Sequence, residues 1–560
     1  MLDLHLRTLI GASIVALVSL GTRAAAQASA GATRSPDWTS YNGNYANDRF
    51  SPLAEITVAN VGHLRRICTF STNDTVSFQA NPIVIAGVVY VSTYNTTYAI
   101  DGSTCAERWR NTRPAERPFL PVNRGVAYGE GRLFRGTSDA HLLAIDTANG
   151  RTLWDVALGD GSKGESIPMA PIVWNGLVFV GTAGGDNFGV RARVYAIDPA
   201  TGAQRWHFDV VPDTGAAVTT WVKRSGENPP SGGGMWTSLS VDSARGILYV
   251  PTGNAAPDFA RQLRPGDNLY TTGILALDAS SGRLLAFVQP IKHDFHDWDI
   301  AAAPAVVTTR AGRSLLAAPG KDGMLYGIDR DGIDRLTKQT AEASSDGGRT
   351  PALYGAAGEH GLVIRYATPT TTRANATAAF SSERETRFCP GSQGGTEWGG
   401  PAWNAALNLL YVNAVDWCTS VKLAKLDTLK VKPGAPWTGD VRGGFGQMDP
   451  KGQWHGWLSA IDADNGQVRW KYQAKAPLLA PVTATAGGLV FTGEVTGDVV
   501  ALDASTGKVL WRDNTTQAIG AGITPYLVKG RERLAVPAGL NSPIWPVNGG
   551  PARVYVYGLP

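Results

Sequence analysis

The stretch Ala144–Trp154 reads Ala-Ile-Asp-Thr-Ala-Asn-Gly-Arg-Thr-Leu-Trp, and the same phrase returns several times along the chain. Its shared form is Ala-x-Asp-x-x-(Thr/Asn)-Gly-x-x-x-Trp. Three further clean copies begin at Ala196, Ala460 and Ala501. Altered copies begin at Ala99 (Cys105 replaces the glycine), at Ala276 (no final tryptophan) and at Gly327 (a degenerate form). Regular self-similarity of this kind indicates a repeat architecture.

The spacing of the copies indicates which repeat architecture this is. The intervals are 45 residues (99 to 144), 52 (144 to 196) and 41 (460 to 501), which suit a four-stranded propeller blade. A tryptophan repeated at a fixed offset is well placed to pack between neighbouring blades. Seven copies, with room for one more in the 133 residues from 327 to 460, predict an eight-bladed, all-β propeller. We expect four-stranded antiparallel blades, with the N- and C-terminal strands closing the ring.

Composition agrees with an all-β protein and excludes some partners. The 560 residues include 66 Gly, 33 Pro and 17 Trp, and only 18% are charged, which favours many short strands over helices. The formal charge is +4 and no run of five Lys or Arg occurs, so nucleic-acid binding is not indicated.

The first 26 residues are predicted to be a secretory signal peptide. Arg7 gives a positive flank, Leu9–Gly21 is mostly apolar, and Ala24–Ala26 offers a small-residue cleavage site. The alternative is a membrane anchor, but the apolar run is shorter than the ~20 residues that a span needs. We therefore expect an exported, periplasmic chain in which residues 27–560 form a single propeller domain without a transmembrane span.

One segment, His293–Asp299, concentrates charge to an unusual degree. It holds two imidazoles and three carboxylates in seven residues, which is costly unless a cation or a catalytic role offsets the repulsion. In an extended segment Asp297 and Asp299 point to the same side. They would suit a hard cation, or one of them would serve as a general base. A solvated polar loop is the alternative interpretation.

Three further segments carry candidate ligand-binding residues. Gly184, Gly185 and Asp186 follow an apolar run, and small residues let the backbone approach a flat ligand closely. Trp236 follows three glycines and would present a ring face to an aromatic ligand. Asn254 offers an amide oxygen suited to Ca²⁺. Glycine-rich turns and a capping asparagine are the structural alternatives.

Two isolated cations would suit an anionic ligand. Arg124 lies in Pro121–Gly125, and Lys321 lies in Pro319–Gly323. Either one taken alone is more often a surface charge. No Cys-x-x-Cys-His motif occurs, so covalently attached haem is not expected. Four cysteines allow three pairings, and export permits two disulfides.

Taken together, these segments resemble the pyrroloquinoline quinone (PQQ) dependent dehydrogenases, the quinoprotein alcohol dehydrogenase family with its eight-bladed propeller. The resemblance begins at Asp37–Gly43 and Arg49–Leu53 and extends to the C-terminus. The Pro-Val-Asn-Arg-Gly and Pro-Thr-Gly-Asn segments are specific in combination. His293–Asp299 matches the family pattern His-Asp-x-Trp-Asp-x-Asp, except that His296 stands where Trp is usual.

The resemblance assigns roles to residues. Asp297 corresponds to the catalytic base and Lys321 to the cation beside the quinone oxygens. A cation, Ca²⁺ or a lanthanide, is expected on Asp186, Asn254, Asp297 and Asp299. The expected PQQ contacts are Gln79, Arg124, Gly184, Gly185, Trp236, Lys321 and Asn413.

The family also implies a structural disulfide between Cys389 and Cys418, and we predict the second pair as Cys68–Cys105. Several positions depart from the family pattern. Gln79 stands where Glu is common, Asp186 stands where Glu is usual, and the stretch Pro118–Leu120 lacks the adjacent cysteines of many members.

Two functions follow, and they belong to different classes. The first is a periplasmic enzyme that oxidises an alcohol or a sugar-like hydroxyl and passes electrons to a separate acceptor such as cytochrome c. The second is a non-catalytic scaffold that resembles outer-membrane assembly lipoproteins, which share the repeat phrase. The scaffold proteins lack the three site motifs and carry a lipobox cysteine that is absent after Ala26. The enzyme is therefore the favoured interpretation.

Overall fold

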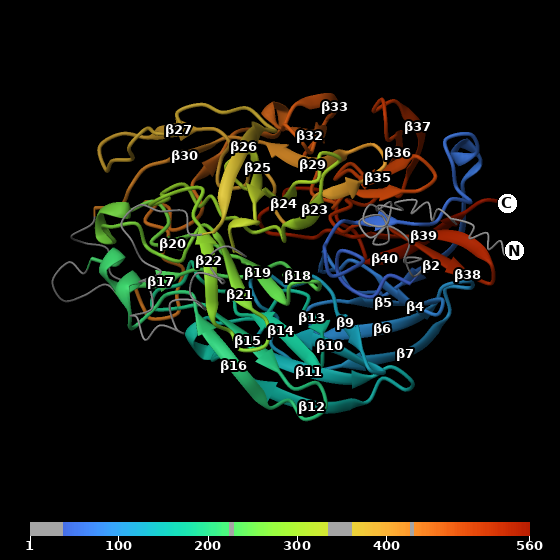
Figure 1. Ribbon diagram of the computed structural model, residues 1–560, viewed down its shortest axis with the longest axis horizontal. Helices are drawn as coiled ribbons and strands as arrows, with labels where there is room; N and C mark the ends of the chain where they lie inside the picture. Colours follow the sequence, from blue (N-terminus) through green and yellow to red (C-terminus); the bar gives the residue numbers. More distant parts are fainter. Residues whose placement is uncertain (1–36, 223–228, 334–360, 426–430) are drawn as a thin grey trace, which may run out of the picture. The chain divides into compact units, whose positions relative to one another are not determined.

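The computed structural model describes residues 37–222, 229–333, 361–425 and 431–560. The signal peptide predicted at 1–26 lies outside these ranges. The description below concerns the compact unit Pro36–Pro560. Its described residues form β-strands joined by turns, loops and short 3-10 helices, as the composition predicts (Figure 1).

Four-stranded antiparallel sheets are the main building unit, and seven such sheets occur in the described parts of the chain, beside one with five strands. The first four sheets contain β4(Ile83–Ile85), β5(Val88–Ser92), β6(Thr96–Asp101), β7(Glu107–Thr112); β9(Ala127–Gly129), β10(Arg132–Gly136), β11(His141–Asp146), β12(Thr152–Ala157); β13(Ile172–Trp174), β14(Leu177–Gly181), β15(Arg193–Ile197), β16(Gln204–Asp209); and β18(Ser240–Asp242), β19(Ile247–Pro251), β21(Ile274–Asp278), β22(Leu284–Val288).

The remaining large sheets follow the same plan. They contain β23(Ala305–Thr308), β24(Ser314–Pro319), β25(Met324–Asp329), β26(Val363–Pro369); β28(Ala402–Asn404), β29(Leu409–Asp416), β32(His455–Asp462), β33(Val468–Ala474); β34(Thr483–Thr485), β35(Leu489–Gly493), β36(Asp498–Asp503), β37(Val509–Asn514), with β1(Phe50–Ser51); and β38(Thr524–Val528), β39(Arg531–Ala538), β40(Arg553–Gly558), with β2(Arg65–Ser71).

Smaller pairings and 3-10 turns lie in the connections between these sheets. They are β3(Ser77–Phe78) with β8(Val122–Asn123), β17(Ser231–Gly232) with β20(Ala255–Ala256), β27(Thr386–Phe388) with β30(Thr419–Val421) and β31(Gln447–Met448), and the turns η1(Val61–His63), η2(Gly161–Lys163), η3(Ala216–Thr220), η4(Arg261–Leu263) and η5(Lys451–Gln453).

The last sheet joins the two ends of the unit. Strand β2, near the start, pairs antiparallel with β40, near the end, with Cys68 opposite Val556 (Figure 1). Strand β1 also adds in parallel to β34. The predicted pairing of N-terminal with C-terminal strands is therefore confirmed.

The repeat phrase has the same local structure in each copy. The ladder shifts register directly after the leading residue, as at Ala144/Ile145 and Ala501/Leu502, so a β-bulge begins the turn. The Asp side chain then accepts backbone N–H groups of the turn, as Asp503 Oδ1 does from Ser505 and Thr506 (2.9 Å each). The glycine has φ near +75°, a left-handed conformation that Gly adopts at low cost.

The tryptophan of each clean copy except the last contacts the turn of a following repeat. Trp470 donates its Nε1–H to Ala504 O (3.2 Å), and a Cβ added at Gly507 would lie 2.5 Å from its ring. The same donation joins Trp109 to Thr147 O, Trp154 to Pro199 O and Trp206 to Ala279 O. Tyr366 replaces Trp in the degenerate copy and donates to Ala463 O (3.1 Å). The predicted packing of the aromatic residue between repeats is therefore confirmed.

Both predicted disulfides are present. Cys389–Cys418 joins the β27 and β30 region, with Cα atoms 4.5 Å apart. Cys68–Cys105 has a Cα separation of 5.8 Å and links β2 of the last sheet to the β6–β7 turn of the first. Cys105 takes the glycine position of its phrase with φ +61°. Between these two sheets, a disulfide therefore takes the place of the Trp–Gly contact that joins other repeats.

Candidate active site

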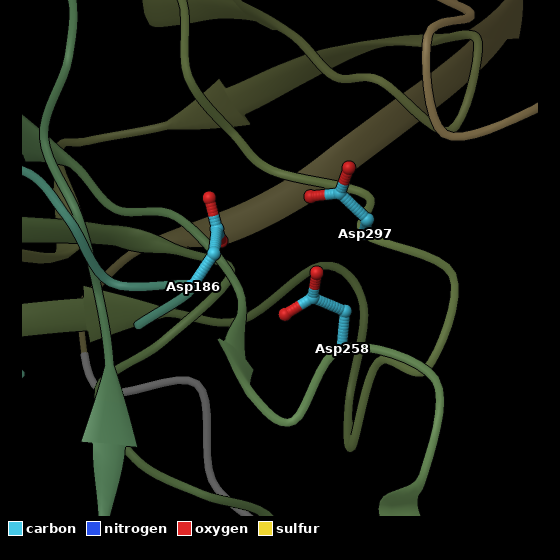
Figure 2. A group of neighbouring side chains, drawn as sticks. All are labelled: Asp186, Asp258 and Asp297. Atoms are coloured by element: carbon cyan, nitrogen blue, oxygen red, sulfur yellow. The ribbon is translucent and has the colours of Figure 1, made fainter. Parts of the chain in front are cut away.

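Three aspartates from separate segments gather at one place. One carboxylate oxygen each from Asp186, Asp258 and Asp297 lies within 4.8 Å of the others, and Figure 2 shows the carboxyl groups around a common space. Asp186 follows β14, Asp258 follows β20, and Asp297 follows β22. Asp258 and Asp297 are buried, and Asp186 is partly exposed. Like charges at this distance repel, so the group favours a bound cation.

Burial and mutual repulsion act on the ionisation of the group. Burial and the charge of Asp299 raise the pKa of Asp186 to about 6. Burial, with the charge of Asp186, raises the pKa of Asp258 well above its usual range. Burial also raises the pKa of Asp297, against the effect of Lys321. Charged carboxylates here need a compensating positive charge.

Asp297 has an unusual backbone and a charged partner. Its φ is +64°, an uncommon value for a residue with a side chain, and such strain clusters at functional sites. Lys321 Nζ donates to Asp297 Oδ2 (2.9 Å) and lies 3.9 Å from Asp299 Oδ2. The segment His293–Asp299 is not a strand, so the alternation of an extended chain does not place these acids. Their shared contact with Lys321 brings the two carboxylates together.

Lys321 keeps its charge in this buried position. Burial lowers its pKa, but the carboxylates of Asp297, Glu397 and Asp299 outweigh that effect, so the net shift is upward. Its backbone N–H also donates to Asp299 O (3.0 Å). The ammonium group is therefore fixed beside the acids as their counter-charge.

Asp299 connects the His293–Asp299 segment to Trp236, the residue expected to present a ring face to the ligand. Its Oδ2 accepts from Trp236 Nε1 (3.0 Å), and its Oδ1 accepts from the backbone N–H of Asn254 (2.6 Å). The Asn254 side chain donates from Nδ2 to Asp258 Oδ1 (2.9 Å). Asn254 therefore lies between Asp258 and Asp299, beside the aspartate group.

Arg124 lies against the same tryptophan. Its guanidinium carbon is 4.7 Å from the Trp236 ring and 5.1 Å from the Trp398 ring, and Nη1 donates to Trp236 O (2.8 Å). Lys321 Nζ is 6.0 Å from the Trp236 ring centroid. Burial lowers the pKa of Arg124 to about 10, which leaves it protonated at neutral pH. Two cations therefore flank one indole.

Several buried polar atoms near these segments have no hydrogen-bond partner in the described part of the chain. They are Gln79 Oε1, Arg124 Nε, Asp258 Oδ2, Glu397 Oε1 and Asn413 Oδ1. An unsatisfied buried polar group is costly, so such atoms point to a polar ligand. Other atoms of these side chains are held: Gln79 Nε2 donates to Ser77 Oγ (2.8 Å) and Asn413 Nδ2 to Leu478 O (2.9 Å).

Gly184 and Gly185 are required by backbone packing. A Cβ at Gly184 would lie 2.1 Å from Gly164 O, and one at Gly185 would lie 2.8 Å from Gly234 N. The two glycines therefore let the Asp186 loop pack against neighbouring backbone, and close approach to a ligand stays a prediction.

Sequence analysis did not identify two residues of the site, Asp258 and Glu397. Asp258 stands four residues after Asn254, and that spacing from a candidate ligand was its only signal. Glu397 is buried between glycine pairs, and burial raises its pKa to about 7 against the effect of Lys321. A single Glu in a glycine-rich stretch carries no motif that would single it out.

Comparison with known proteins places this chain in a family. The model of the PQQ glucose/ethanol/alcohol dehydrogenase β-propeller domain matches residues 38–333, which contain every candidate site residue except Glu397 and Asn413. The chain belongs to this family of quinoprotein dehydrogenases. A second model, of the outer membrane protein assembly factor BamB, matches residues 455–540.

Individual relatives agree with this assignment. The chain is 30% identical over 500 residues to the lanthanide-dependent methanol dehydrogenase of Methylacidiphilum fumariolicum strain SolV, covering 82% of this chain and 77% of the relative. It is 29% identical over 547 residues to the quinohemoprotein alcohol dehydrogenase of Comamonas testosteroni, covering 91% and 73%. The crystal structure of quinohemoprotein alcohol dehydrogenase from Comamonas testosteroni superposes with a TM-score of 0.79 at 26% identity, covering 95% of this chain and 82% of the other.

Proposed function

We propose that this chain is a PQQ- and metal-dependent dehydrogenase that oxidises an alcohol or a sugar-like hydroxyl. Its residues 27–560 form an eight-bladed propeller, and it acts in the periplasm. It passes electrons to a separate acceptor such as cytochrome c. The observation that carries this proposal is the meeting of Asp297 with Lys321 (2.9 Å) beside Asp186 and Asp258. A buried acid with a fixed cation and further carboxylates suits proton abstraction next to a metal ion.

The residues of the site fit the cofactor that the family implies. Trp236 supplies an aromatic face, Arg124 and Lys321 supply positive charge beside it, and buried polar atoms of Gln79 and Asn413 need partners. These residues, with the loop at Gly184 and Gly185, would hold PQQ. When bound, PQQ supplies the two-electron acceptor that protein side chains lack.

The chain's own groups would perform the remaining steps. Asp186, Asn254, Asp297 and Asp299 would hold a Ca²⁺ or lanthanide ion, since hard cations take carboxylate and amide oxygens. A carboxylate oxygen of Asp297 would accept the proton of the substrate hydroxyl. Lys321 would keep that carboxylate oriented through its hydrogen bond. Binding and orientation of the hydroxyl beside Asp297 would then account for specificity.

The scaffold function has weaker support. The assembly-factor match is confined to 455–540, a region that holds two clean repeat phrases and no candidate site residue. It therefore reflects blade sequence, and fold likeness alone does not assign function. No helix in the described residues is long and apolar enough to cross a membrane.

Reconstitution tests the proposal. Purified protein is stripped of metal, combined with PQQ and either Ca²⁺ or La³⁺, and screened by dye reduction over alcohols and sugars. We expect PQQ binding with both ions and turnover of at least one hydroxyl compound. Absence of PQQ binding with either ion would favour the scaffold function.

A further inference from the structure

We propose that Asp258 is an additional metal ligand in this chain and that it shifts the site's preference toward a trivalent lanthanide over Ca²⁺. The inference rests on the proposed function for the location of the ion and goes beyond it in the ligand and the ion charge.

The first observation is the state of the Asp258 carboxylate. It is fully buried, and one of its oxygens belongs to the group that meets within 4.8 Å (Figure 2). Asn254 Nδ2 donates to Oδ1 (2.9 Å) and holds the group in place. Oδ2 has no partner among the residues that the structure describes. A buried anionic oxygen without a donor is costly, and a cation removes that cost.

The second observation is that the nearby arginine is committed elsewhere. Arg264 donates from Nε to Pro257 O (2.9 Å) and from Nη2 to the backbone oxygen of Asp258 (3.0 Å). Its Nη1 donates to Asn268 Oδ1 (2.9 Å). Arg264 therefore fixes the backbone at Asp258 through hydrogen bonds to other oxygens, and the carboxylate is left for another cation.

The charge of the cluster favours a trivalent ion. Asp186, Asp258, Asp297 and Asp299 together with the ammonium of Lys321 carry a net charge of minus three when all are ionised. A trivalent ion neutralises that charge, and a divalent ion leaves one negative charge in a buried site. Coulomb attraction scales with the product of charges, so each added carboxylate gains more from a trivalent ion.

Ion binding to the full-length protein tests the inference without relying on turnover. Metal-stripped protein, with and without PQQ, is titrated with Tb³⁺ by tryptophan-sensitised luminescence, and Ca²⁺ is measured by competition. The variant is Asp258→Asn, which keeps shape and removes charge. The control is Asp416→Asn, another buried aspartate, whose Oδ2 accepts from Trp457 Nε1 (2.9 Å). Thermal unfolding verifies that each variant is folded.

We expect the wild-type protein to bind Tb³⁺ more tightly than Ca²⁺. Asp258→Asn should weaken Tb³⁺ binding by roughly 10–100-fold and Ca²⁺ binding by less, and Asp416→Asn should change neither. Equal Tb³⁺ affinity of folded Asp258→Asn and wild type would overturn the ligand assignment. If Asp258→Asn does not fold, the wild-type protein provides the test. Equal affinity of wild type for Tb³⁺ and Ca²⁺ contradicts the inferred preference for a trivalent ion.

The outcomes separate this inference from the proposed function. Tb³⁺ binding that depends on Asp258 in a protein that never binds PQQ would support the ion site and contradict the dehydrogenase. PQQ-dependent turnover with Tb³⁺ affinity unaffected by Asp258→Asn would support the enzyme and remove Asp258 from the ligands.

Discussion

The ammonium of Lys321 donates a hydrogen bond of 2.9 Å to Asp297 Oδ2, and the two side chains are only 4% and 3% exposed. The same residue donates its backbone N–H to Asp299 O (3.0 Å). Lys321 is thus tied to two of the three acids of the His293–Asp299 segment, to Asp297 through its side chain and to Asp299 through its backbone. This double contact fixes the position of Asp297, the expected base.

Lys321→Met should leave the aspartate group without its counter-charge. Removing one partner of a buried ion pair costs about 3–5 kcal/mol, so we expect a lower thermal midpoint and lost dye reduction. Added La³⁺ should restore part of the midpoint, because the ion supplies the missing charge. Lys471→Met is the control, since that lysine lies over Trp457 (4.3 Å) and bonds to Thr370 O. A Lys321→Met enzyme with normal turnover would contradict the role of the pair.

Asp297→Asn should retain PQQ binding and lose turnover, because an amide cannot accept the substrate proton. The expected fall in kcat is about 10²–10⁴-fold, the range for loss of a general base. Turnover is measured with saturating PQQ and metal, and cofactor binding is followed by absorbance in the same samples. Full turnover of the variant would show that another group is the base.

Gly507→Ala should destabilise the contact between two repeats. The added Cβ would lie 2.5 Å from the Trp470 ring, and overpacking of this kind costs typically about 1–3 kcal/mol. Gly530→Ala is the matched control, because Gly530 has the same φ of +73° and nothing within 4 Å of an added Cβ. Urea unfolding should therefore show the larger loss for Gly507→Ala, and equal losses would mean that backbone strain alone decides.

Removal of the disulfide between the last and first sheets should lower stability. Cys68 and Cys105 are 37 residues apart in sequence, and closing a loop of that length contributes roughly 3–4 kcal/mol in the chain-entropy model. The double variant Cys68→Ser/Cys105→Ser is compared with wild type by urea unfolding, under oxidising conditions and after reduction. Reduction should bring wild type below the double variant, because it also opens Cys389–Cys418. An unchanged midpoint in the double variant would contradict the prediction.

Glu532 should make stability depend on pH. Its Oε2 accepts the backbone N–H groups of Glu55 (2.8 Å) and Ile56 (2.9 Å), and burial raises its pKa to about 7 from 4.5. The folded state therefore binds the proton more tightly than the unfolded state. That contribution is complete below about pH 4.5 and is lost as the pH rises through about 7.

The thermal midpoint of wild type should consequently fall across this pH window more than that of Glu532→Gln. Glu107→Gln, which removes an exposed pair with Arg110, is the control and should follow wild type. Parallel curves for wild type and Glu532→Gln would show that Glu532 does not titrate in the window.

The fold was predictable because the repeat phrase is a local device. In Ala501–Trp511, eleven residues contain the bulge, the Asp-capped turn, the left-handed glycine and the tryptophan. A short stretch of sequence therefore shows all four features. The partners of the tryptophan are also predictable, because a blade can only pack against its neighbours. Even the exception at Cys105 was visible, since it breaks the phrase at the glycine.

The site residues that belong to a sequence motif were predictable. Contacts between residues from distant segments were not, because they form only when those segments meet in the fold. His293–Asp299, Asn254 and Lys321 stand in recognisable segments, and the structure brings them together through Asp299 and Lys321. The contact of Trp236 with Asp299 could not be predicted from either segment, because 63 residues separate them. Glu397 carries no local pattern, and only its burial reveals it.

The sequence by itself determined the blades and the segments that carry charge, because each depends on residues near one another or on a repeated pattern. Only the tertiary structure decided that Asp258 joins Asp186 and Asp297, with an oxygen of each within 4.8 Å of the others. These aspartates follow three different strands, β14, β20 and β22. The distance between such side chains is set by how separate segments pack, and no local pattern encodes that distance.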